Sequence, residues 1–117
     1  MTHALVLSPS AREDIVDLLE WSIDHFGNGV RDSYEALIET ALSAIGDDPL
    51  IAGSSDRPEI GEGVRSMHLS VCRDRVGRGV RRILRPRHCI FYRQVGETVF
   101  VSRVLHEARS IEQQRFP

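Results

Sequence analysis

The sequence predicts an α+β fold in which an N-terminal strand and an antiparallel helical hairpin pack on one face of a mainly antiparallel β-sheet. Two segments near residues 9–26 and 30–45 carry apolar side chains at helical spacing, and only a short glycine-containing turn separates them. Three β-branched, aromatic or alternating segments follow between residues 64 and 105. The 117 residues suit a single domain, 1–117.

The first elements are a strand and an amphipathic helix. "THALVLS" is a short strand candidate that we expect at an edge of the sheet. Two signals place the helix start at residues 9–11: Ser8 before Pro9, or a capping box of Ser10 and Glu13. The helix should bury one face and expose an acidic back. The buried face is Ile15, Leu18, Leu19 and Phe26; the back is Glu13, Asp17, Glu20 and Asp24.

A second helix should start after Gly27-Asn28-Gly29 and end near Gly46 and Pro49. Its apolar face is Val30, Tyr34, Leu37, Ile38, Ala41, Leu42 and Ile45. The segment 47–62 is rich in Pro, Gly, Ser and Asp and is predicted to be a loop.

The remaining elements are strands. "VRSMHLSVC", 64–72, alternates with Met67, Leu69 and Val71 as the inner face. A polar turn follows, and "HCIFYRQV" and "TVFVSRVL" should form a hairpin across residues 96–97. Residues 107–116 are predicted to form one or two helical turns.

The net charge of −2 hides a strong asymmetry. Residues 1–62 carry 13 acidic residues and 3 arginines, a net of −10, whereas residues 63–117 carry 12 arginines and 4 acidic residues, a net of +8. The chain has no lysine. A basic half indicates an acidic partner, nucleic acid or protein, unless the two halves pair with each other in the fold.

Compartment and cofactors follow from what the sequence lacks. No apolar run is long enough for a membrane helix, and the N-terminus does not resemble a signal peptide, so a cytoplasmic protein without a membrane partner is expected. Cys72 and Cys89 are expected to be free thiols. The spacings of His68, His88 and His106 with either cysteine match no standard zinc pattern, so no metal site and no cofactor are predicted.

Arginines are the main candidates for a binding surface, because guanidinium groups bind carboxylates and phosphates in a bidentate manner. The alternative is a solvated sheet face with local pairs to Glu97, Glu107 and Glu112. Arg103 stands out, since it lies in phase with Val99, Val101 and Leu105 on the apolar side of a strand. A charge there must pair with a helix acid or be covered by a partner. The arginines of the candidate surface are Arg82, Arg85, Arg87, Arg93, Arg103 and Arg109.

Three other side chains complete the candidate partner-binding set. Trp21 lies off the apolar face of its helix, where it can anchor an interface or pack under the 47–62 loop. His106, at a strand end, can cap the backbone or act chemically. Tyr92 is expected to pack on a sheet face with its hydroxyl at the rim. His68 should face solvent.

The C-terminal stretch "RHCIFYRQVGETVFVSRVLHEARSIE" resembles the C-terminal hairpin of ParE-type toxins of the RelE/ParE toxin–antitoxin superfamily. "LSPSAREDIVDLLEW" resembles the first helix of that family. The resemblance implies a RelE/ParE-like fold and a type II toxin that inhibits DNA gyrase by binding. A cognate ParD-like antitoxin would neutralise it, in a toxin–antitoxin hetero-oligomer.

Two other functions stay open. A RelE-like, ribosome-dependent ribonuclease needs an acid, a base and cations. Such toxins use arginines, a lysine and a tyrosine near the C-terminus, whereas this chain has no lysine and no tyrosine after residue 92. Arg85, Tyr92 or the pair His88 and His106 would have to serve, so no catalytic residue is assigned. The last alternative is a non-toxic partner-binding module.

Overall fold

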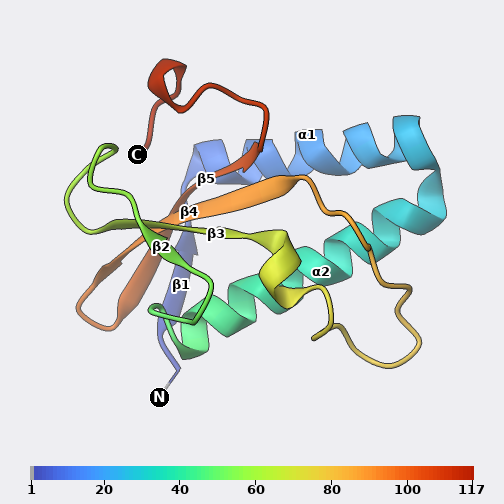
Figure 1. Ribbon diagram of the computed structural model, residues 1–117, viewed down its shortest axis with the longest axis horizontal. Helices are drawn as coiled ribbons and strands as arrows, with labels where there is room; N and C mark the ends of the chain where they lie inside the picture. The colour runs from blue at the N-terminus through green and yellow to red at the C-terminus, as the bar shows by residue number, and fades with distance from the viewer. Residues whose placement is uncertain (1) are drawn as a thin grey trace.

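The computed structural model describes residues 2–117, which form a helical hairpin on one face of a five-stranded mixed sheet (Figure 1). The strands run in the order β1-β5-β4-β3-β2. β1 is an edge strand parallel to β5, and the other pairs are antiparallel. The predicted α+β fold and the edge position of the first strand are therefore confirmed. The elements are β1 Ala4–Leu7, α1 Pro9–Phe26, α2 Asn28–Asp47, β2 Ser55–Asp56, β3 Val64–His68, η1 Leu69–Cys72, β4 His88–Val95, β5 Thr98–His106 and η2 Ile111–Gln113.

The two helices begin and end where their caps allow. The Ser8 side chain accepts a hydrogen bond from the Ala11 amide at 2.9 Å, and Pro9 takes the first helical position, so the first of the two predicted start signals is the one used. Gly27 joins the helices with φ +87°, which a residue with a Cβ rarely adopts. One residue therefore suffices to reverse the chain.

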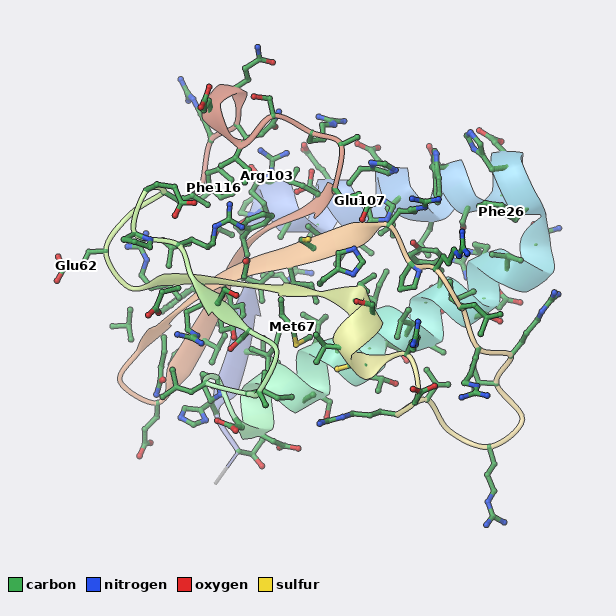
Figure 2. All side chains as sticks on the ribbon, viewed as in Figure 1. Phe26, Glu62, Met67, Arg103, Glu107 and Phe116 are labelled. Atoms are coloured by element: carbon green, nitrogen blue, oxygen red, sulfur yellow. The ribbon has the colours of Figure 1, made fainter. Side chains whose placement is uncertain are left out.

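The core lies between the sheet and the hairpin. The predicted inner faces of both helices are buried or partly buried there, except that Phe26 is 58% exposed. It is the last residue of α1, beyond the edge of the sheet, and Figure 2 shows it at the far end of that helix. Met67 points from β3 into the core and is fully buried. The acidic back of α1 faces solvent, as predicted.

Two predictions about the middle of the chain are wrong. The strand expected over residues 64–72 ends at His68, because the His68 side chain accepts the Ser70 amide and starts the 3₁₀ turn η1. Leu69 nevertheless stays buried, while Val71 is only partly so. The predicted loop 47–62 contains the two-residue strand β2, which pairs with Ser66 and Arg65.

A β-bulge in β5 decides which way Arg103 points. Phe91 pairs with Arg103 but Tyr92 pairs with Val101, so Ser102 is an extra residue. Beyond the bulge the alternation reverses, and Val104, rather than Arg103, joins Val101 in the core. The predicted phase of Arg103 is therefore wrong.

The helix-free face of the sheet is partly covered by the end of the chain. The rings of Phe91 and Phe116 meet edge-on, 5.1 Å apart. Figure 2 shows Phe116 near Arg103 on this side of β5. Along residues 2–117, no helix is long and apolar enough to cross a membrane.

Candidate functional site

Two histidines meet where β4 begins and β5 ends. His88 and His106 are paired across the hairpin, and their rings lie 5.1 Å apart. The indole of Trp21, on α1, packs edge-on against both. These three side chains line a pocket of about 270 Å³ that also includes Asp14, Asp17, Leu18, Val104, Leu105 and Arg109. We call it the His–Trp pocket.

His88 is held as a neutral donor by a buried hydrogen-bond chain. The Tyr34 hydroxyl accepts the Arg87 amide at 2.7 Å and lies 3.2 Å from His88 Nδ1. The Tyr34 hydroxyl has one proton that it can donate to Nδ1, and with that donation the ring proton of neutral His88 lies on Nε2. Burial, reinforced by repulsion from His106 and His68, lowers the pKa of His88 to about 4. Burial also raises the pKa of Tyr34, so that hydroxyl keeps its proton.

His106 has a structural partner of its own. Its Nδ1 accepts the Ala108 amide at 3.0 Å, which confirms that this histidine hydrogen-bonds the backbone at its strand end. The other ring nitrogen then carries the proton when the ring is neutral. Within residues 2–117, no group of three or more His, Cys, Asp or Glu side chains is placed to hold a metal ion.

Glu107 ties the neighbouring strands together beside this pocket. It accepts from Arg87 Nη1 and from His68 Nε2, both at 2.9 Å. These two hydrogen bonds lower the pKa of the Glu107 carboxyl. His68, whose side chain is 29% exposed, is thus open to solvent in part and also engaged in a polar contact. Figure 2 shows Glu107 at the end of β5.

Arg103 forms the most enclosed ion pair among the described residues. Its Nε and Nη2 bind the two oxygens of Asp14, at 2.7 and 2.8 Å, and both side chains are about seven-eighths buried. Asp14 also accepts the Val104 amide at 3.0 Å. The hydrogen bond to Asp14 raises the pKa of Arg103. The helix-acid alternative for Arg103 is therefore the one observed.

Trp21 and Arg109 are the members of the predicted set that line the His–Trp pocket together with His106. Trp21 packs against Tyr34, His88 and His106 rather than under the 47–62 segment, so the second of its two predicted placements is not the one observed. The Trp21 indole packs edge-on against the ring of Tyr34 and is partly buried. Arg109 is exposed at the rim, and no ion pair engages it within the described residues.

The other predicted arginines lie elsewhere. Arg82 and Arg85 are in the exposed loop between η1 and β4, and Arg82 pairs with Asp74. Arg93 lies on the helix-free face of β4, opposite Phe100 of β5. Arg87 pairs with Glu107. The structure thus divides the predicted arginine surface among the His–Trp pocket, the loop and the helix-free face.

Tyr92 is completely buried, so the expectation that its hydroxyl lies at the rim is wrong. The hydroxyl donates to the Pro49 carbonyl at 2.6 Å and fixes the segment after α2 to the sheet. No surface of this side chain is left for a partner.

Tyr92→Phe should lower the free energy of unfolding by about 1–3 kcal/mol, because the buried Pro49 carbonyl loses its donor. Urea unfolding followed by far-ultraviolet circular dichroism measures this change. Ser43→Ala is a suitable control, since Ser43 is exposed. A Tyr92→Phe variant as stable as the control would contradict the role of this hydroxyl.

Sequence reasoning missed Asp14 and Tyr34, which position the site. Asp14 lies in α1 among several acidic residues, and nothing in their spacing separates it from Asp17 or Glu13. Tyr34 follows the apolar phase of α2 and was predicted only as core. His88 was considered as an acid or base together with His106, and the structure places the two rings 5.1 Å apart.

The comparisons with known proteins identify the family through one family model and show the same fold in two solved structures. A family model described as "ParE toxin of type II toxin-antitoxin system, parDE" matches residues 5–111. A chain of the Mycobacterium tuberculosis RelBE2 toxin–antitoxin complex is similar in structure, with 20% identity and a TM-score of 0.56 over 91% of this chain and 99% of that one. A chain of the E. coli DinJ–YafQ toxin–antitoxin complex has 14% identity and a TM-score of 0.51 over 92% and 96%. No curated protein matches by sequence.

Proposed function

The chain belongs to the ParE toxin family of type II toxin–antitoxin systems, and from this membership we infer that it acts by binding DNA gyrase and is neutralised by a cognate ParD-like antitoxin. The match over residues 5–111, which includes the helical hairpin and the sheet, is the observation that carries the proposal.

The geometry of the His–Trp pocket supports binding rather than catalysis. Cleavage of RNA requires one group that takes a proton and one that gives a proton. His88 is a buried donor whose Nδ1 is occupied by Tyr34, and its low pKa disfavours a protonated, acidic form. Two further side chains of the pocket, the partly buried Trp21 and the exposed Arg109, are of the types that anchor protein interfaces.

We propose that this rim contacts the target. Arg109→Ala should then weaken inhibition of gyrase about 30-fold or more, the effect of a residue worth about 2 kcal/mol in an interface. The assay adds purified toxin to gyrase with relaxed plasmid and measures the concentration that halves supercoiling. Protein-linked linear DNA reports a trapped cleavage state.

Arg115→Ala is the matched control, because Arg115 is also exposed and its side chain makes no ion pair among the described residues. It should inhibit like the unmodified toxin. Supercoiling that continues at every toxin concentration would overturn the gyrase proposal. Equal inhibition by the two variants would remove the rim from the target contact.

A ribosome-dependent ribonuclease is the second candidate, and the specific observation in its favour is the His88–His106 pair beside Arg109. Its test is primer extension on a translated messenger RNA with and without toxin. Cuts that disappear in His106→Ala, with gyrase unaffected, would replace the first proposal with this one.

A further inference from the structure

The segment between η1 and β4 concentrates positive charge. Residues 73–87 contain seven arginines and one aspartate, a net charge of +6 in fifteen residues. All seven arginines are exposed. We call this segment the arginine loop; in Figure 1 it extends from η1 past α2 before it enters β4. Its arginines are Arg73, Arg75, Arg78, Arg81, Arg82, Arg85 and Arg87.

The base of the loop is fixed to the body of the protein. Pro86 is buried, and Val76 and Ile83 pack against the core. Arg73 donates to the Leu84 carbonyl at 3.0 Å across the loop. Arg82 pairs with Asp74, the one acidic residue of the segment. These contacts hold the loop in a defined shape with its other arginines outward.

Three arginines remain available to a ligand. Arg78, Arg81 and Arg85 make no ion pair and no side-chain hydrogen bond within residues 2–117. Arg87, by contrast, is engaged by Glu107. Arg75 lies in a groove with Glu39 and Asp47 of α2, so its charge is partly offset.

The chemistry of the loop favours a phosphate backbone. Guanidinium groups bind phosphate in a bidentate manner. The loop has no aromatic side chain on which a base of a single strand can stack. The loop also offers little apolar surface to a protein partner. Among its large hydrophobic side chains, only that of Leu84 is more than half exposed.

We propose that the arginine loop binds the backbone of duplex DNA through Arg78, Arg81 and Arg85. For its biological setting this inference rests on the proposed action on gyrase, an enzyme that holds duplex DNA. The contact would add a DNA-bound anchor to the protein contact at the His–Trp pocket. Duplex binding itself does not need gyrase. A toxin that does not bind DNA would refute this inference alone, and a toxin that does not inhibit gyrase would refute the proposed function alone.

The test measures binding of the full-length toxin, free of antitoxin, to a fluorescein-labelled random-sequence duplex by anisotropy. Three phosphate contacts predict a slope of about −2.7 when the logarithm of the binding constant is plotted against the logarithm of the salt concentration. The affinity should therefore fall about 40-fold between about 50 and about 200 mM salt. Arg78→Gln with Arg81→Gln should reduce that slope by about 1.8. Arg78→Lys with Arg81→Lys should retain it, because lysine keeps the charge.

The matched control is Arg12→Gln with Arg115→Gln, which removes the same charge from exposed positions outside the loop. It should keep the slope of the unmodified toxin. The proposal is overturned if the toxin does not bind the duplex at low salt. It is also overturned if both glutamine pairs lose binding equally, or if a single strand of the same length binds more tightly.

Discussion

Asp14→Ala should lower the free energy of unfolding by about 3 kcal/mol, the largest loss expected from removing one charged side chain of this protein. The substitution leaves Arg103 largely buried without its counter-ion, and it leaves the Val104 amide without its acceptor. One carboxylate makes both contacts because of where β1 ends. Leu7, its last residue, pairs with Val101, so the first turns of α1 cover the edge of β5 beyond that point. Urea unfolding at neutral pH measures the effect.

Asp17→Ala is the matched control, since Asp17 lies one turn further along α1 and is exposed. It should change stability by less than about 0.5 kcal/mol. Arg103→Ala and the double variant complete a double-mutant cycle that isolates the coupling between the two side chains. A coupling near zero would show that the pair contributes nothing beyond its separate side chains.

The cycle also bears on how toxin variants are interpreted. Arg103 is largely occupied by Asp14, Gln114 and the Arg115 carbonyl. Loss of toxicity in Arg103→Ala can therefore arise from a weakened fold without any lost partner contact. Arg109, which is exposed, is the better probe of the surface.

The toxin should lose about 2 kcal/mol of stability between about pH 7 and about pH 5 through His88 alone. The pKa of His88 is about 4 in the folded protein and about 6.5 for the free side chain. Within that window the unfolded chain takes up a proton that the folded protein does not, so acid favours unfolding. The contribution reaches about 3 kcal/mol as the pH falls to about 4, and then levels off.

Urea unfolding at the two pH values, with the unmodified protein and His88→Gln, measures this contribution. The variant should be less stable at neutral pH but should lack the His88 part of the pH dependence. His25→Gln should retain it, because His25 is exposed on α1. The assignment fails if His88→Gln and the unmodified toxin lose the same stability on acidification.

The site was only partly predictable, and the residues show why. Two features could be inferred from the positions of residues at strand ends. One is the hydrogen bond of His106 to the backbone, and the other is the proximity of His88 to His106, because paired strands bring their ends together. The burial of Tyr92 and the hydrogen bond from its hydroxyl to Pro49 did not follow, because they depend on where the segment after α2 crosses the sheet. Tyr34 likewise gained its role through a contact with Arg87 and His88, more than fifty residues away.

The sequence by itself determined the helical hairpin and the β4–β5 hairpin. The helices followed from the apolar spacing and the Ser8-Pro9 and Gly27 signals, and the strands from their composition and short turn. These are local properties, since periodicity and capping involve neighbours within a few residues. The tertiary structure alone decided the bulge at Ser102, and with it the turn of Arg103 away from the core toward Asp14. One extra residue in a strand reverses the side of every later side chain, and only the packing of the whole sheet selects where that residue lies.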